Sequence, residues 1–305
     1  MNQITWLEDV PDAERWGVYE TPFDIDDIEY LATMKHRSTT TRLCVKKPPA
    51  LVERTVDLLA GFQNANIVEL GISQGGSAAM IAQVARPRKL VALELDDEPV
   101  EELENFVKRA GLAERVRPYY GVDQSDRDQV RTIIDKEFAG EPIDLVLDDA
   151  SHLLDATRES FDVLFPRLRP GGLFILEDWN WEHVKAKNLH DQVVKPGSDL
   201  RSGFAERFRE AMSDPNSREH LAFKEWLEDL ASNKSSQPRM LARPLTILVI
   251  ELLLARAWSS DAISELLVQE LWVRVTRGPE PIDPNTFRLA DIVNDRFGLL
   301  PRHAR

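Results

Sequence analysis

Cysteine is almost absent from this chain of 305 residues, in which Cys44 is the single example. One cysteine cannot form an intramolecular disulfide, which indicates a reducing compartment, so we expect a cytoplasmic protein. The surrounding sequence TRLCVKK carries no local activating signature. A small buried apolar side chain is therefore a better interpretation of Cys44 than a nucleophile.

A secretory signal and a membrane-spanning run are also missing. The N-terminus is acidic and has no cationic start followed by an apolar stretch. The most apolar stretch, residues 245–258, is interrupted by Glu251 and Arg256 and is shorter than the ~20 residues that span a bilayer. We therefore expect no membrane partner. Because this helical stretch is apolar on more than one face, we expect a homo-oligomer.

Basic residues are in the minority. The chain has 38 lysines and arginines against 52 acidic residues, which gives a formal net charge of −14. A polyanion would be repelled at long range, so a nucleic-acid partner is disfavoured. Apolar residues make up 43% and charged residues 30%, which is an ordinary globular composition for one domain with elaborations.

Apolar strand candidates alternate with helical segments in the middle of the chain. This alternation predicts βαβ units, and hence a doubly wound, mostly parallel α/β sheet of the Rossmann-like type. The strands are expected near residues 68, 92, 118, 146 and 175. The helices between them are expected over residues 77–85, 98–111, 126–138 and 157–168.

The flanking segments complete the domain prediction. Residues 1–45 are interpreted as an N-terminal cap with a short helix over 24–34, and residues 46–305 as the main domain. Polar, breaker-rich residues 183–240 are expected to form a helical insertion, either a lid or a dimerisation arm. Residues 264–269 and 270–278 predict a terminal antiparallel hairpin.

A glycine-rich turn, VELGISQGGSA at residues 68–78, is the sharpest local signal. Gly71, Gly75 and Gly76 allow positive φ and close approach of a ligand to the backbone, and a helix is expected to begin near Ser77. The spacing is GxxxGG and not the dinucleotide fingerprint GxGxxG. Such a turn suits an aminocarboxylate ligand, provided that an acid is present for its ammonium group.

Acidic residues close three successive strands and suit a nucleoside at the carboxyl edge of the sheet. Glu69 is the candidate for the ammonium group, Glu94 for the ribose hydroxyls with Asp96 second, and Asp123 for the adenine amino group. Taken singly, each acid is better explained as a solvated strand end or a helix cap, and only the combination favours a nucleoside. The further candidates for cofactor contact are Ser77, Gln124 and Asp148.

The glycine turn, Glu94 and the segments DDASH and LEDW resemble class I methyltransferases. More narrowly, they are similar to the metal-dependent group that includes macrolide-sugar O-methyltransferases and cephalosporin hydroxylase-like proteins. The resemblance covers roughly residues 46–182. It implies S-adenosylmethionine as the methyl donor and a small hydroxyl-bearing acceptor, a sugar or a polyketide-type compound.

Two neighbouring strands are expected to end in a cluster of carboxylates. Asp149, Glu177 and Asp178 would repel one another unless a cation lay between them, and Mg²⁺ prefers such oxygen ligands. His152 follows Asp149 by three residues, and the resemblance makes it the candidate general base, with Asp149 beside it in the catalytic set. The alternatives are a helix cap, a solvated loop and an ordinary loop histidine.

Several residues further along the chain were weaker candidates for the same site. His183 and His190 lie downstream of the acidic segment. Trp179 and Trp181 are interpreted either as an apolar wall for a sugar or polyketide or as core residues.

The function predicted from these motifs is Mg²⁺-dependent O-methylation of a sugar or secondary metabolite. A hydroxylase-like oxidoreductase is the alternative suggested by part of the resembling group, although the sequence has no flavin or dinucleotide motif and no facial triad of metal ligands. A non-catalytic protein that binds S-adenosylmethionine is the third interpretation.

Overall fold

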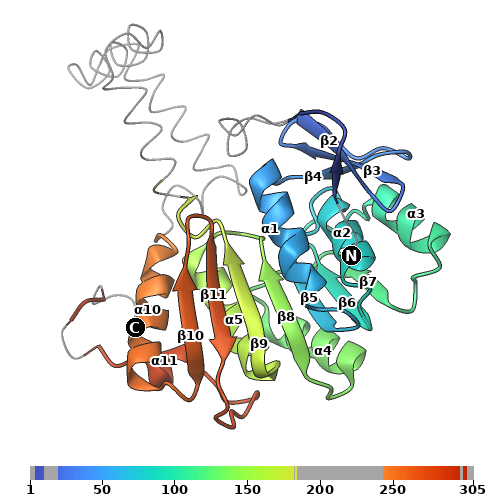
Figure 1. Cartoon of the computed structure of the whole chain (residues 1–305). Coiled ribbons are helices and arrows are strands. Elements are labelled where there is room, and N and C mark those ends of the chain that lie inside the picture. Colours follow the sequence, from blue (N-terminus) through green and yellow to red (C-terminus); the bar gives the residue numbers. More distant parts are fainter. Residues whose placement is uncertain (1–3, 10–19, 182, 184–242, 296–297, 301–305) are drawn as a thin grey trace, which may run out of the picture.

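The computed structural model describes residues 4–9, 20–181, 183, 243–295 and 298–300 (Figure 1). Its larger sheet has seven strands in the order β10-β11-β9-β8-β5-β6-β7. The central strands from β9 to β7 are parallel, and the order reverses beside β5, as in doubly wound folds. The predicted fold class is therefore confirmed. The strands are β5 (Asn66–Leu70), β6 (Lys89–Leu93), β7 (Val116–Tyr119), β8 (Ile143–Asp148), β9 (Leu168–Glu177), β10 (Ile263–Val268) and β11 (Trp272–Arg277).

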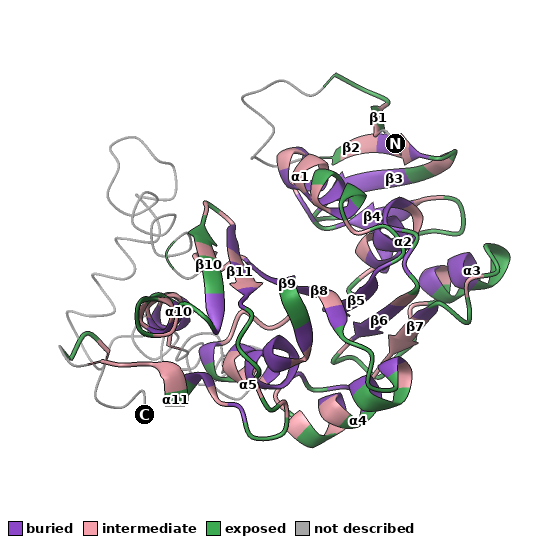
Figure 2. Cartoon of the chain, turned by 60° about the horizontal axis from the view of Figure 1, so that its bottom comes forward, coloured by how far each residue is buried: buried purple, intermediate pink, exposed green. Residues whose placement is uncertain are grey.

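Helices cover both faces of this sheet (Figure 2). Strand residues alternate between two apolar clusters, so that Ile67 packs on one face and Val68 on the other. Both faces are buried, which explains why the strands have continuous apolar sequences. On the Ile67 face lie α1 (Pro49–Ala60), α2 (Gly76–Val84) and α3 (Glu101–Arg109). On the other face lie α4 (Arg127–Phe138), α5 (Leu154–Leu164) with the short turn η1 (Phe165–Arg167), α10 (Thr246–Trp258) and α11 (Leu289–Ile292).

The N-terminal region forms a second sheet, and the helix predicted over residues 24–34 is wrong. The four strands β1 (Thr5–Trp6), β2 (Glu20–Ile25), β3 (Ile28–Thr33) and β4 (Leu43–Val45) lie in that order. Asp26 and Asp27 form the two-residue turn between β2 and β3, with φ of 48° and 63°. Aspartate tolerates this left-handed conformation, and two such residues give the turn that suits a hairpin.

The C-terminal hairpin is confirmed, because β10 and β11 pair antiparallel and β11 continues the sheet beside β9. Helix α10 buries Leu248, Leu252 and Ala255, while Leu253 and Trp258 remain exposed. None of the helices in the described ranges is both long and apolar enough to cross a membrane. The predicted insertion at 183–240 lies outside the described residues apart from His183, and the same is true of His190.

Candidate cofactor and metal site

The glycine turn joins β5 to α2 at the carboxyl edge of the sheet. Gly71 and Gly75 have φ of +93° and +79°, which only glycine adopts readily. A Cβ on Gly71 would lie 2.4 Å from the carbonyl oxygen of Asp149. The amide of Asp149 donates to the carbonyl of Leu70 at 3.0 Å. The turn after β5 and the loop after β8 therefore pack directly against each other.

The N-terminal sheet holds the other side of this turn. A Cβ on Gly76 would lie 2.2 Å from the carbonyl oxygen of Cys44, which itself is buried at the centre of β4. The Ser38 hydroxyl donates to the carbonyl of Gln74 at 2.6 Å and accepts from the amide of Cys44 at 2.9 Å. The sheet that the sequence did not predict is thus part of the scaffold of the site.

Glu94 links the glycine turn to the residues that follow β6 through hydrogen bonds. One carboxylate oxygen accepts the backbone amides of Ile72 and Ser73 at 2.9 and 2.7 Å. The other oxygen accepts those of Leu95 and Asp96 at 2.9 and 3.3 Å. These four bonds use most of the acceptor capacity of a carboxylate. The structure therefore shows a role in shaping the turn, and contact of Glu94 with ribose stays a prediction.

Glu69 lies under the turn and carries a free carboxylate oxygen. Its side chain is buried and its Oε2 has no hydrogen-bond partner among the residues that the structure describes. Burial raises the pKa of Glu69 to about 8, against the effect of a hydrogen bond from Ser77. A buried polar atom without a partner is costly, so it is a candidate for contact with a ligand.

Gln124 and Asp148 form a buried network beneath the loop after β8. The Gln124 amide donates to Asp148 at 3.4 Å, and its oxygen accepts the amide of Ser151 at 3.0 Å. Ser160 donates to Asp148 at 3.2 Å, and burial raises the pKa of Asp148 to about 7. This network orients the loop that carries Asp149 and His152. Direct contact of Gln124 and Asp148 with a cofactor stays a prediction.

Asp123 lies on the exposed loop after β7. Its carboxylate accepts hydrogen bonds from the amide and the hydroxyl of Ser125 at 2.8 and 2.7 Å, which is the pattern of an Asx turn. The residue is at the same edge of the sheet as Glu69 and Glu94. Its contact with adenine is not tested by this geometry and remains a prediction.

The predicted cluster of acids and histidine forms where β8 and β9 end side by side. Ligand atoms of Asp149, His152 and Asp178 all lie within 4.8 Å of one another. His152 Nε2 is 3.9 Å from Asp149 Oδ1. His152 and Asp178 have φ of 55° and 50°, a conformation that costs energy and that recurs at functional sites. Asp149 and Asp178 are therefore placed to hold a metal ion, and His152 lies beside them.

Lys47 is also part of this cluster, although no motif in the sequence indicates it. Its Nζ donates to Asp149 Oδ2 and to Glu177 Oε2, each at 2.6 Å. Burial alone would lower the pKa of Lys47, but the two carboxylates outweigh it and raise the pKa above its ordinary value. Burial raises the pKa of Glu177, which Lys47 opposes. The cation that the three acids require is therefore supplied in part by the protein itself.

The residues after Glu177 bind the C-terminal hairpin. Trp179 Nε1 donates to the carbonyl of Gln269 at 2.8 Å, and its ring packs against the apolar cluster on the α5 face. His183 lies 2.5 Å from the Thr246 hydroxyl at the start of α10, and it is not part of the described metal-type cluster. Trp179 thus has a structural contact, and His183 is a weaker candidate for the base than His152.

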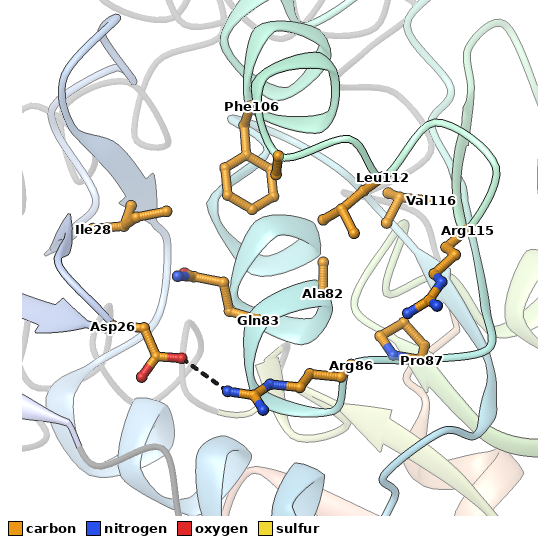
Figure 3. Close-up of a pocket in the computed structure, with 11 residues that line it drawn as sticks. Asp26, Ile28, Ala82, Gln83, Arg86, Pro87, Phe106, Leu112, Arg115 and Val116 are labelled. Atoms are coloured by element: carbon orange, nitrogen blue, oxygen red, sulfur yellow. Dashed lines mark hydrogen bonds and ion pairs between the residues drawn. The ribbon is translucent and has the colours of Figure 1, made fainter.

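An apolar cavity of about 310 Å³ lies at the opposite, amino edge of the sheet (Figure 3). It is lined by the C-terminal halves of α2 and α3, by the segments that lead into β6 and β7, and by Asp26 and Ile28 of the N-terminal hairpin. Arg86 pairs with Asp26 at its rim, with a separation of 3.4 Å. None of the candidate site residues lines this cavity, so it is separate from the site described above.

Comparison with protein families identifies the part of the chain that carries this site. Residues 68–179 match the family described as methyltransferase domain. This range begins within β5, contains the glycine turn and the acid cluster, and ends just after β9. This match supports the resemblance to class I methyltransferases for this region of the chain.

Two curated relatives are named as O-methyltransferases. The 8-demethyl-8-alpha-L-rhamnosyl tetracenomycin-C 2'-O-methyltransferase of Streptomyces olivaceus is 48% identical over 56 residues, which are 18% of this chain and 14% of that protein. The mycinamicin VI 2''-O-methyltransferase of Micromonospora griseorubida is 42% identical over 74 residues, 19% of this chain and 18% of that protein. The matched segments thus span less than a fifth of these relatives.

Two solved structures of methyltransferases are also similar to this chain. The MycE methyltransferase of the mycinamycin pathway, in complex with Mg, SAH and mycinamycin VI, has a TM-score of 0.42 at 20% identity, over 84% of this chain and 51% of that one. The O-methyltransferase TomG from Streptomyces achromogenes, in complex with SAM, has a TM-score of 0.39 at 20% identity, over 55% of this chain and 70% of that one.

Proposed function

We propose that this protein is an O-methyltransferase that moves the methyl group of S-adenosylmethionine to a hydroxyl of a sugar or a sugar-bearing natural product, with Mg²⁺ at the acceptor. The proposal rests on one observation, which is that a candidate cofactor-binding acid and a candidate metal site lie at the same edge of the sheet. The unpartnered oxygen of Glu69 lies at the glycine turn after β5, and the cluster of Asp149, His152 and Asp178 lies at the ends of the neighbouring strands β8 and β9. The names of the curated relatives support the sugar acceptor.

The chain's own residues suit the methyl donor. The ammonium group of S-adenosylmethionine would satisfy the free oxygen of Glu69, and the open backbone at Gly71 and Gly75 allows the aminocarboxylate to approach. Glu94 holds the turn in the required shape. Ribose binding by Glu94 or Asp96 belongs to the proposal.

The acid cluster suits a hard divalent cation. Asp149 and Asp178 offer carboxylate oxygens near the opening, and Glu177 completes the set from the buried side, where it contacts Lys47. A bound Mg²⁺ would lower the pKa of the acceptor hydroxyl. His152, whose Nε2 is 3.9 Å from Asp149 Oδ1, would accept the hydroxyl proton while the methyl group is transferred.

The experiment measures transfer of a labelled methyl group from S-adenosylmethionine to a panel of rhamnosides, other glycosides and simple phenols. We expect transfer to at least one glycoside, loss of transfer in chelator, and recovery on addition of Mg²⁺. Asp178→Asn should lose turnover while retaining affinity for S-adenosylhomocysteine, and Asp155→Asn, an exposed acid on α5, is the matched control. Full activity in chelator would remove the metal from the proposal, and binding of the nucleoside without transfer to any acceptor would favour the non-catalytic interpretation.

A further inference from the structure

Lys47 connects the N-terminal sheet to the acid cluster. It follows β4, which ends at Val45, and precedes α1, which begins at Pro49. Only 5% of its side chain is exposed, although lysine is rarely buried. The two prolines that follow Lys47 restrict the backbone at this point, because proline fixes its own φ and limits the residue before it. Hydrogen bonds to two carboxylates hold the ammonium group in one place.

That place is between two of the three acids proposed to surround the metal. Lys47 Nζ is 2.6 Å from both Asp149 and Glu177, and the Glu177 side chain is 2% exposed. A buried ion pair of this geometry is expensive to desolvate, and an apolar replacement is often no less stable. A gain in folding stability therefore does not explain why a lysine occupies this position. The net charge of the metal site is the alternative explanation.

The negative charges of the ionised acids explain why a positively charged residue lies among them. Asp149, Glu177 and Asp178 carry three negative charges when a cation binds, and Lys47 reduces the sum to two. Two negative charges match one divalent ion. Without Lys47 the same pocket would keep one excess negative charge after a divalent ion had bound.

We infer that Lys47 is a positioning residue that sets the charge of the metal site, occupying Glu177 and one oxygen of Asp149 so that the divalent cation is held mainly by Asp149 and Asp178 at the opening. The inference rests on the metal site of the proposed function. In this arrangement the lysine weakens the affinity for the cation by repulsion. Metal binding is therefore moderate and exchangeable, and the N-terminal sheet controls it through β4.

The test measures Mn²⁺ binding at pH 7 in the full chain without methyl donor, from the electron paramagnetic resonance signal of free Mn²⁺. In Lys47→Met, which keeps most of the length of the side chain and removes its charge, the affinity for Mn²⁺ should rise at least about tenfold. Lys46→Met is the matched control, because Lys46 is the adjacent, exposed lysine. The affinity of this variant for Mn²⁺ should equal that of the wild type.

A second pair of variants tests the charge argument independently of the single mutant. Glu177→Gln should bind Mn²⁺ at least about tenfold more weakly than the wild type, and Lys47→Met in that background should restore affinity to within about threefold. If Lys47→Met alone does not fold, as judged by circular dichroism, the comparison of Glu177→Gln with the double variant decides.

Weaker Mn²⁺ binding in a folded Lys47→Met protein would overturn the inference, as would a double variant that binds no better than Glu177→Gln. Failure of this inference leaves the proposed function intact, provided that the wild type binds Mn²⁺ and S-adenosylhomocysteine. Absence of Mn²⁺ binding in the wild type and in all variants would overturn both this inference and the metal part of the proposed function.

Discussion

Replacement of Glu69 by glutamine should have opposite effects on stability and on binding. Burial raises the pKa of Glu69 from 4.5 to about 8, so the folded protein binds its proton more tightly than the unfolded chain does. The resulting stabilisation is fully present below pH 4.5 and is lost as the pH rises through about 8. At about 1.36 kcal/mol for each pKa unit, the loss is at most roughly 5 kcal/mol.

Glutamine has nearly the same shape and cannot ionise, so Glu69→Gln should not show this loss. The assay is urea unfolding of the wild type and the variant at pH 5.5, 7 and 8.5. The difference in unfolding free energy, wild type minus variant, should become more negative by at least about 1 kcal/mol between the lowest and highest pH. Other buried acids such as Asp148 titrate in this range in both proteins, and the subtraction removes them. Glu98→Gln, at an exposed glutamate, is the control.

The same variant should lose affinity for the methyl donor. If Glu69 binds the ammonium group, glutamine should weaken binding of S-adenosylhomocysteine by about 1.5–3 kcal/mol, the value for a hydrogen bond to a charged group. A variant with an unchanged pH dependence of stability would refute the buried-acid reasoning. A variant with unchanged affinity would refute the assignment of Glu69 to the cofactor.

Three further predictions address the scaffold, the base and the ribose. Gly76→Ala should destabilise the protein by several kcal/mol, since a Cβ there would lie 2.2 Å from the Cys44 carbonyl, and thermal unfolding checks this. His152→Ala should reduce turnover by about 10²–10⁴, because the variant lacks the proposed proton acceptor. Unchanged turnover would show that another residue is the base. Asp96→Asn and Glu94→Gln should be compared by calorimetry: the ribose acceptor is the one whose loss weakens binding by about 1.5–3 kcal/mol without lowering the melting temperature.

The central sheet was predictable because its strands have a strong local pattern. Five apolar runs separated by helical segments, with glycine after the first, determine both the βαβ order and the edge at which ligands bind. The convergence of Asp149 with Asp178 followed from that order, since neighbouring parallel strands end at the same edge. The structure confirms that β8 and β9 are neighbours.

The N-terminal sheet and Lys47 were not predictable in the same way. The pattern around Asp26 and Asp27 fits a helix as well as a hairpin, and only the positive φ of both residues decides between them. Lys47 meets Asp149 and Glu177 across 102 and 130 residues of sequence. No local pattern distinguishes it from Lys46, its exposed neighbour, because burial depends on how β4 packs against the glycine turn.

The most direct test of the account is a calorimetric titration of the wild-type protein with S-adenosylhomocysteine. The account predicts one site per chain with micromolar affinity, because the glycine turn and the buried oxygen of Glu69 are already in place. It also predicts that binding persists in Asp178→Asn, whose side chain lies on the metal side of the site. Absence of detectable heat or thermal stabilisation at millimolar ligand would contradict it.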